Sequence, residues 1–317
     1  MTTREVEHEI AVDAPAPAVY RLLAEVVNWP RIFPPTIHVD QVERSEGEER
    51  IRIWATAGAG GEAKNWTSRR TLDPEALRIT FRQEISAPPV AAMGGTWIVE
   101  PLDGDRARVR LLHDYRAVDD DPAGLAWIDD AVDRNSRSEL AALKINVEAA
   151  HAAEELTFSF TDSVQVAGAA KDLFDFIDQA DRWEERLPHV ATVRLTEDAP
   201  GLQTLEMDTR AKDGSTHTTK SYRVTFPHRR IVYKQVTLPA LLTLHTGVWT
   251  FDEGPDGTVA SSQHTVTLNT ENIPAVLGPD AGVSDARAYV HSALSTNSLA
   301  TLGHARAYAE NLAGEQG

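Results

Sequence analysis

Residues 29–34 read Trp-Pro-Arg-Ile-Phe-Pro, and residues 183–188, which lie 154 positions later, read Trp-Glu-Glu-Arg-Leu-Pro. Further motifs return in the same order, 151 to 153 positions on: Ser68-x-Arg70 as Ser221-x-Arg223, Phe81-Arg82-Gln83 as Tyr233-Lys234-Gln235, Gly95-Thr96-Trp97 as Gly247-Val248-Trp249, and His113 as His264. This period is much longer than the roughly 20–50 residues of solenoid and propeller repeats. The sequence therefore predicts two copies of one domain, which we place at residues 1–152 and 153–317.

The bulk composition is that of an ordinary globular protein and narrows the classes of function. Hydrophobic residues make up 42% of the 317 residues, so each half can bury a core of its own. The net charge of −17 is shared almost evenly between the halves, and it argues against nucleic acid or an anionic membrane as a partner. With no cysteine, the chain has no disulfide or thiolate chemistry. No signal peptide or membrane span is evident, so we expect a cytoplasmic protein.

The order of the expected elements is the same in both halves. Each half opens with an alternating strand, and the first of these carries apolar or His side chains at every second position from Val6 to Val12. A short helix (18–27 in the first half) and a Pro-rich bend follow. A run of antiparallel strands comes next, with a turn at 46–49 in the first half, and one long amphipathic helix ends the half. This order predicts the α+β class, with a curved antiparallel sheet around a long C-terminal helix.

The Ser-x-Arg repeat is the strongest candidate for chemistry. Two positions apart on a strand, Ser68 and Arg70 point to the same face, as do Ser221 and Arg223, and Trp66 shares the face of the first pair. If that face is the concave one, the buried guanidinium needs a partner, and a polarised carbonyl or an enolate suits its planar shape. The alternative is a solvated strand face with exposed arginines.

Aromatic and polar residues supply the other candidates. The candidate aromatic residues are Trp29, Trp66, Trp97, Trp183 and Trp249. Indole rings that face a cavity could hold a flat substrate, although core packing is the simpler interpretation for any single tryptophan. Asn135 and Asn297 stand in the two long helices, where asparagine is mildly unfavourable, so they either face the cavity or cap a bend.

The histidines and the remaining sequence motifs bear on catalysis, metal binding and cofactor binding. His113 and His264 could act as general acids or bases, or could simply be packed or exposed. We expect no metal site, because no histidine or carboxylate cluster has the spacing of metal ligands. Motifs for serine hydrolases, phosphate-binding loops and dinucleotide folds are missing from the sequence.

At these residues the chain resembles a known family. Trp29-Pro30-Arg31-Ile32-Phe33-Pro34, Trp66-Thr67-Ser68-Arg69-Arg70 and Arg134-Asn135-Ser136-Arg137 are similar to aromatase/cyclases of bacterial type II polyketide synthases, and the duplicated layout is similar to their di-domain members. The resemblance covers essentially the whole chain. It implies two tandem helix-grip (START/Bet v 1-like) domains.

The resemblance also implies an activity. Such enzymes direct an aldol cyclisation, here expected between C7 and C12, and a dehydration of a poly-β-ketone held on an acyl carrier protein. Other components of the synthase are the further partners, and no cofactor is needed. Arg70 matches the pocket arginine, Ser68 and Asn135 match polar pocket residues, and Trp29, Trp66 and Trp97 match the aromatic lining; the second-half counterparts follow from the repeat. The chain departs from single-domain relatives at their pocket tyrosine, where Thr36 and Val190 stand.

Two other functions compete with this reading. A non-enzymatic carrier of hydrophobic small molecules on the same fold should have an almost wholly apolar pocket. An interaction module with a degenerate second half should have lost Ser221, Arg223 and Asn297, which are kept. The sequence leaves open the chain length of the polyketide, its reduction before cyclisation, the oligomeric state and the division of labour between the halves.

Overall fold

The structure is a computed structural model that describes residues 3–57, 62–152, 156–210 and 216–316. Contacts divide the chain into two compact units, Met1–Glu154 and Glu155–Gly317. The expected domain boundary, between residues 152 and 153, falls at the edge of a stretch outside the described residues. Each unit is described below by itself.

The first unit contains an antiparallel seven-stranded sheet in the order β1-β7-β6-β5-β4-β3-β2. Its elements in chain order are β1 (Arg4–Val12), α1 (Ala16–Ala24), η1 (Val26–Asn28), α2 (Trp29–Ile32), β2 (Thr36–Arg44), β3 (Glu48–Ala57), β4 (Glu62–Asp73), β5 (Arg78–Gln83), β6 (Val90–Pro101), β7 (Ala107–Ala117), η2 (Val118–Asp120) and α3 (Pro122–Ala152).

The second unit repeats this layout, with the strand order β8-β14-β13-β12-β11-β10-β9. Its elements are β8 (Thr157–Val166), α4 (Ala170–Asp178), η3 (Ala180–Arg182), α5 (Trp183–Arg186), β9 (Val190–Ala199), β10 (Leu202–Arg210), β11 (Thr216–Phe226), β12 (Arg230–Thr237), β13 (Leu242–Gly254), β14 (Gly257–Leu268), η4 (Thr270–Asn272), α6 (Ile273–Leu277) and α7 (Val283–Gln316).

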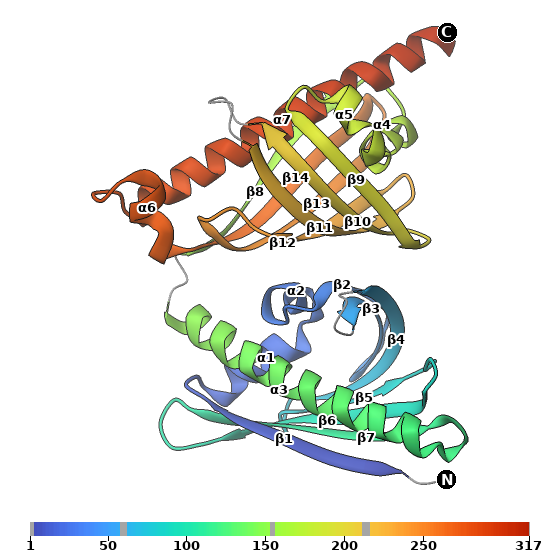
Figure 1. Ribbon diagram of the computed structural model, residues 1–317, viewed down its shortest axis with the longest axis vertical. Coiled ribbons are helices and arrows are strands. Elements are labelled where there is room, and N and C mark those ends of the chain that lie inside the picture. The colour runs from blue at the N-terminus through green and yellow to red at the C-terminus, as the bar shows by residue number, and fades with distance from the viewer. Residues whose placement is uncertain (1–2, 58–61, 153–155, 211–215, 317) are drawn as a thin grey trace. The chain divides into compact units, whose positions relative to one another are not determined.

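The long helix of each unit lies across its own sheet (Figure 1). Helix α3 contacts β1 and β7, and α7 contacts β8 and β14. In the first unit Val109 and Leu111 of β7 share one buried cluster with Leu140 and Leu143 of α3. The sheet face toward the helix, called the inner face below, therefore carries the core. The predicted α+β fold, a curved antiparallel sheet around a long C-terminal helix in each of two tandem domains, is confirmed.

The expected Pro-rich bend is a short helical segment. The first short helix ends at Ala24, earlier than the predicted end at residue 27, and the chain continues through η1 into the single turn α2. Pro30 occupies one of the first two positions of α2, where a missing N–H leaves no helical hydrogen bond unmade. The same turn, α5, begins at Trp183 in the second unit.

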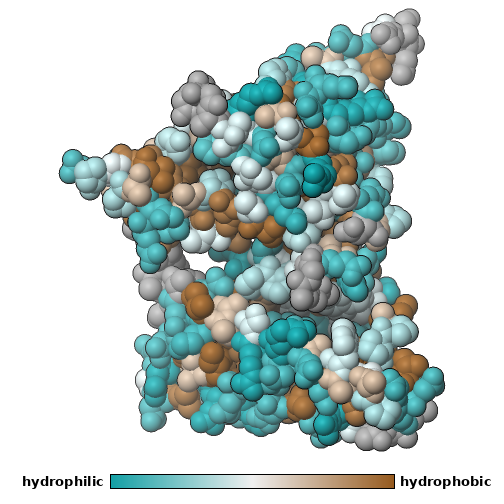
Figure 2. Space-filling view, viewed as in Figure 1, coloured by the Kyte–Doolittle hydropathy of each residue, from teal (hydrophilic) through white to brown (hydrophobic). Residues whose placement is uncertain are grey.

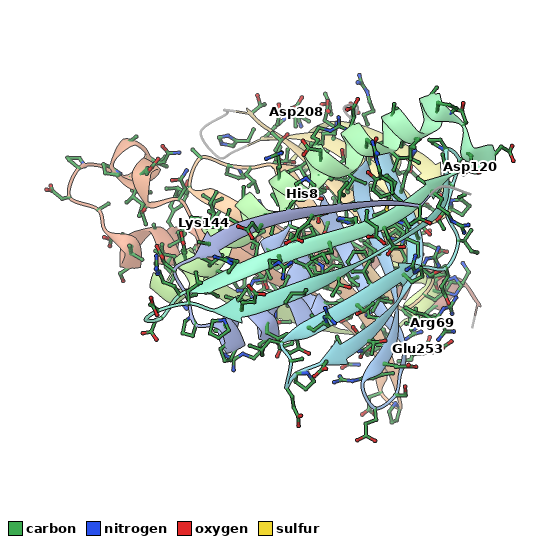
Figure 3. All side chains as sticks on the ribbon, turned by 90° about the horizontal axis from the view of Figure 1, so that it is seen from below. His8, Arg69, Asp120, Lys144, Asp208 and Glu253 are labelled. Carbon is green, nitrogen blue, oxygen red and sulfur yellow. The ribbon has the colours of Figure 1, made fainter. Side chains whose placement is uncertain are left out.

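The outer surface is mixed in polarity. Figure 2 shows hydrophilic residues over most of the visible face, with apolar residues in scattered places. The alternation along β4 illustrates how the two faces are separated. Arg69 is exposed (Figure 3), whereas Ser68 and Arg70, one position to either side, are 3% and 2% exposed. The arginine of the repeated motif therefore points inward, and the alternative of a solvated strand face is wrong for Arg70.

Candidate active site

The repeated motifs form one line across the inner face of each sheet. In the first unit directly paired residues on five successive strands are Glu49, Arg70, Phe81, Gly95 and His113. In the second unit the corresponding residues are Gln203, Arg223, Tyr233, Gly247 and His264. We call these two lines the inner rows. Motifs that are far apart in the sequence are thus neighbours in space, because consecutive strands pair antiparallel.

Arg70 is held by groups from three elements. Its Nη1 atom lies 2.9 Å from Oε1 of Glu49, and its Nη2 atom donates a 2.9 Å hydrogen bond to the carbonyl oxygen of Leu23 in α1. The guanidinium carbon lies 5.0 Å from the centre of the Trp29 ring, within cation–π range. Glu49 also accepts a hydrogen bond from Gln41. The partner that a buried arginine needs is therefore supplied by the protein itself.

Arg223 has similar neighbours but a different charge balance. Its Nη2 atom donates a 2.7 Å hydrogen bond to the carbonyl oxygen of Ile177 in α4, and its guanidinium lies 5.5 Å from the ring centre of Trp183. Gln203 faces it where Glu49 faces Arg70. The nearby carboxylate is Asp178, which accepts a 3.1 Å hydrogen bond from Gln203. Arg223 is therefore balanced by a carboxylate that Gln203 holds in place.

Burial lowers the pKa of Arg70 to about 10, against the opposing effect of Glu49, and burial also lowers the pKa of Arg223 to about 10, against the opposing effect of Asp178. Both side chains remain cationic at neutral pH. Among the described residues, Nε of Arg70 and Nη1 of Arg223 are enclosed without a hydrogen-bond partner. Enclosed donors of this kind are costly unless something binds them. Each arginine therefore retains an enclosed donor that no protein acceptor in the described part of the chain satisfies.

The serines of the repeated motif differ between the units. The Ser68 hydroxyl donates a 3.0 Å hydrogen bond to the carbonyl oxygen of Arg82, whereas Ser221 is half-buried beside Gln235 on the next strand. Trp66 is half-buried on the same face of β4 as Ser68, and Thr219 stands at the matching place in β11. The two inner faces are therefore not chemically equivalent at this level.

The four repeated tryptophans fall into two pairs. Trp29 and Trp183 each lie against the arginine of their unit, and each indole N–H donates to a carbonyl oxygen of the preceding helix, that of Leu23 or Phe176. Trp97 and Trp249 are buried members of the core clusters, at 6% and 8% exposure, as Trp183 also is at 7%, but among the described residues they do not lie against an arginine. Core packing accounts for the second pair, and contact with the arginine distinguishes the first.

A glycine separates the aromatic residue from the histidine in each inner row. A Cβ atom on Gly95 would lie 2.7 Å from Cζ of Phe81, and one on Gly247 would lie 2.4 Å from the hydroxyl oxygen of Tyr233. Such distances are far below van der Waals contact, so the ring can occupy its place only because the residue beneath it has no side chain. The motif Gly-x-Trp therefore returns for a steric reason.

The histidines end the inner rows in different surroundings. The ring of His113 lies edge to face with Phe81, 5.6 Å between centres, and its Nδ1 atom is 3.5 Å from the Ser136 hydroxyl. His264 has a much closer set of partners. Its Nε2 atom lies 2.7 Å from the Ser298 hydroxyl, and its Nδ1 atom lies 2.9 Å from Nε2 of His245. Burial lowers the pKa of His113 and of His264 to about 4.

Comparisons with known proteins agree with this geometry. Two family models, both described as polyketide cyclase / dehydrase and lipid transport, match residues 12–127 and 157–303. The chain is 62% identical to the granaticin polyketide synthase bifunctional cyclase/dehydratase of Streptomyces virginiae, over 95% of this chain and 98% of the relative. It is 46% identical to the actinorhodin polyketide synthase bifunctional cyclase/dehydratase of Streptomyces coelicolor, over 96% of each chain.

The chain belongs to the polyketide cyclase/dehydratase family. The crystal structure of the di-domain ARO/CYC BexL, from the BE-7585A biosynthetic pathway, is 69% identical, with a TM-score of 0.91 over 97% of this chain and 99% of that one. The di-domain ARO/CYC StfQ, from the steffimycin pathway, is 36% identical, with a TM-score of 0.87 over 98% and 99% of the two chains. The predicted membership among di-domain aromatase/cyclases is thereby confirmed.

Two residues that family resemblance suggested lie outside the inner rows. Asn135 and Asn297 are exposed on the long helices, and the next residue in each case, Ser136 or Ser298, is the one that is buried against the sheet. Successive residues of a helix differ in direction by about 100°, so only one of each pair can face the histidine. The histidine at the end of each inner row therefore lies next to a serine of the long helix, and the asparagine points elsewhere.

Three buried or half-buried side chains were not predicted from the sequence. Glu49 was assigned to a turn, but β3 already begins at Glu48 and turns Glu49 inward. His245 was not singled out, although strand alternation places it on the same face as Gly247. Glu139 of α3 is half-buried, and burial raises its pKa to about 7. No helix in the described part of the chain is long and apolar enough to cross a membrane.

Proposed function

We propose that this chain converts a carrier-protein-bound poly-β-ketone into a cyclised, dehydrated product, joining C7 to C12 in the first ring. The observation that carries the proposal is the match along nearly the whole chain to relatives named bifunctional cyclase/dehydratase of polyketide synthases. A cationic, partly unsatisfied arginine on the inner face of each sheet supports it. The proposed partners are the other components of a type II synthase, which supply the poly-β-ketone and use the cyclised product.

The reaction makes one carbon–carbon bond and releases one water. A methylene carbon between two carbonyl groups loses a proton and attacks a distant carbonyl carbon, whose oxygen then takes up a proton. Removal of a second proton and departure of that hydroxyl as water give the double bond, and enolisation completes the aromatic ring. These steps need an oriented substrate and stabilised enolate oxygens, which preorganised donors in a water-poor site can supply.

In this proposal Arg70 and Arg223 donate to enolate or carbonyl oxygens through their remaining N–H groups. Ser221, which is half-buried, is better placed to meet a substrate than Ser68, whose hydroxyl already binds a backbone carbonyl. Trp29 and Trp183 fix the guanidinium planes, and Trp66 adds an aromatic surface to the first unit. The carrier protein presents the substrate as a thioester, so the site itself needs to recognise only the polyketone.

The experiment is a reconstitution. A minimal polyketide synthase and malonyl units are incubated with and without this chain, and with and without a ketoreductase, and products are identified by mass spectrometry and NMR. A shift from mixed shunt products to one cyclised, dehydrated compound is the expected result. An identical product profile with and without the chain would contradict the proposal.

The same experiment separates the runner-up function, a non-enzymatic carrier of hydrophobic small molecules, which the lipid-transport part of the family description favours. A carrier would leave the products unchanged and would bind them. To test the arginine role without leaving a buried charge unpaired, Arg70→Met is combined with Glu49→Gln, and Glu49→Gln alone is the control. We expect the double variant to lose about 100-fold in cyclisation rate through the first unit.

A further inference from the structure

Three inner-face positions are polar in the second unit where the first unit is apolar. Tyr233 stands at the place of Phe81, His245 at the place of Met93, and Ser262 at the place of Leu111. Random drift toward polarity inside a core is costly, since each buried polar group must find a partner. Each of these three polar side chains therefore needs a buried partner of its own.

The polar side chains bind one another around His264. Nε2 of His245 lies 2.9 Å from Nδ1 of His264, and the hydroxyl oxygen of Tyr233 lies 3.0 Å from the same Nδ1 atom. On the other side of its ring, Nε2 of His264 lies 2.7 Å from the Ser298 hydroxyl and 3.2 Å from the Ser262 hydroxyl. We call Tyr233, His245, His264, Ser262 and Ser298 the His264 cluster.

The hydrogen bond between His245 and Gln235, which lies next to the His264 cluster, fixes the direction of the hydrogen bonds within the cluster. Nδ1 of His245 lies 2.5 Å from the amide oxygen of Gln235, and with the amide in this orientation an oxygen can only accept. Nδ1 of His245 therefore carries the proton and its Nε2 atom accepts from Nδ1–H of His264. Nε2 of His264 then accepts from the Ser298 hydroxyl.

This direction leaves the phenol proton of Tyr233 available. The protonated Nδ1 of His264 can donate to the phenol oxygen but cannot accept from it. The other acceptor within reach, Nε2 of His245, is 3.4 Å away and already accepts from His264. A contact of that length is a weak hydrogen bond. The phenol proton is consequently free to bind an oxygen atom of another molecule.

Exposure singles out the same residue. His245 and His264 are 5% and 4% exposed, whereas Tyr233 is half-buried. Of these three rings, that of Tyr233 is therefore the most accessible to a molecule that enters the second unit. Tyr233 is also the direct neighbour of Arg223 in the inner row, so the two donors are on adjacent strands.

Burial raises the pKa of Tyr233 well above its usual value, so the phenol stays protonated at any working pH. Burial and the adjacent imidazole of His264 lower the pKa of His245 to about 3. Both histidines are therefore neutral, as the hydrogen-bond direction requires. A neutral phenol in an enclosed site is a strong donor to a developing oxyanion.

We infer that Tyr233 is a catalytic hydrogen-bond donor of the second unit, which stabilises an enolate oxygen of the substrate, and that His264 and His245 are its positioning residues. The inference rests on the proposed function for the identity of the substrate. Tyr233 neither gains nor loses its proton: the carbon proton passes to water, and the departing hydroxide recovers it, so that one water leaves. Phe81 has no hydroxyl, so the first unit cannot do the same at this position.

The test uses the full chain and two readouts. The first is the rate of dehydrated product in the reconstituted synthase, which we expect Tyr233→Phe to lower by about 100-fold. The second is the binding of 6-cyano-2-naphthol, a flat aromatic alcohol whose absorption distinguishes the anion from the neutral form. We expect the ratio of affinities for anion over neutral form to fall about 10-fold in Tyr233→Phe, and several-fold in His245→Met.

Tyr308→Phe is the matched control, because Tyr308 is partly buried against the same apolar cluster as Tyr233 but does not belong to the His264 cluster. It should change neither readout. The affinity ratio does not depend on overall stability, so a merely structural role of the histidines would leave it unmoved. A folded Tyr233→Phe variant with the native affinity ratio, or a native chain that shows no preference for the anion, overturns the inference. If the native chain leaves the synthase products unchanged while the affinity ratio still depends on Tyr233, the proposed function is refuted and the role of Tyr233 as an oxyanion donor stands.

Discussion

Glu49 and Arg70 lie directly opposite each other on β3 and β4 and form a 2.9 Å ion pair that is almost completely shielded from water. In the second unit Gln203 faces Arg223 at the same place, and the compensating carboxylate is moved to Asp178. The same buried cation is thus stabilised in two ways in one chain. The difference makes the ion pair open to a direct experimental test.

Replacing Glu49 by Gln should destabilise the first unit by about 3 kcal/mol, because it leaves Arg70 buried without a counter-charge while the shape is kept. Urea unfolding at neutral pH measures the change. Glu48→Gln, one residue earlier and exposed, is the control and should stay within about 0.5 kcal/mol of the native chain. Equal effects of the two substitutions would show that the ion pair contributes nothing.

Replacing Gly247 by Ala should displace the Tyr233 ring, since the new methyl carbon would lie 2.4 Å from its hydroxyl oxygen. We expect a loss of about 1–3 kcal/mol in unfolding free energy, as for other overpacked sites, and the same fall in anion preference as in Tyr233→Phe. Gly303→Ala is the control: nothing lies within 4 Å of a Cβ there, and Ala favours the helix. A Gly247→Ala variant with native stability would mean that the ring is not held over the glycine.

Acid should destabilise the second unit through its paired histidines. Burial lowers the pKa of His245 to about 3 and that of His264 to about 4, below the value of about 6.5 in an unfolded chain. Between about pH 6.5 and 4 the unfolded chain therefore binds protons that the folded chain refuses. Stability should fall by roughly 1.4 kcal/mol per pH unit for each histidine as the pH is lowered.

Unfolding free energies measured at intervals from pH 7.5 to 4.5 check this slope. His264→Gln should reduce it, and His217→Gln, at an exposed position, should not. If His264→Gln keeps the full native slope, the imidazole is not held neutral by the fold.

Glu139 should have the opposite dependence. Burial raises its pKa to about 7, so the folded chain keeps a proton that the unfolded chain has already lost. Its contribution is complete below the unfolded value of about 4.3 and disappears as the pH rises through about 7. Glu139→Gln should therefore stabilise the chain at pH 8 by about 1–2 kcal/mol, a value reduced for the partial exposure of the side chain.

The matched control for Glu139 is the exposed Glu75→Gln, which should leave stability at pH 8 unchanged. Differential scanning calorimetry at pH 5 and pH 8 compares the variants. A Glu139→Gln variant that is less stable than the native chain at pH 8 would contradict a protonated carboxyl.

The repeat and the alternation of side chains were sufficient to predict the fold and to place Ser68 and Arg70 on one face of a strand, but they left open whether that face is buried. Both depend on local periodicity, which a single sequence carries. The partners of Arg70 could not be predicted in this way. Glu49 was placed in a turn, because a run of three glutamates and one glycine (residues 46–49) looks the same whether the strand begins within it or after it.

The exposed position of Asn135 could not be predicted for a different reason. Helical spacing tells which residues share a face but leaves the rotation of the helix about its axis open, and a rotation by one residue exchanges Asn135 for Ser136. The link from His245 to His264 depends on strand pairing, because the two residues are 19 positions apart in the sequence. Such contacts follow from register, which needs the sheet to be known.

The duplicated fold also provides an internal reference. A chain that contains both Phe81 and Tyr233 always presents them in a ratio of one to one, at the same concentration, temperature and salt. A difference in ligand response between the halves cannot then arise from unequal expression or purity. One sample of the protein thus contains, on the same fold, an aromatic position with a hydroxyl group and one without it.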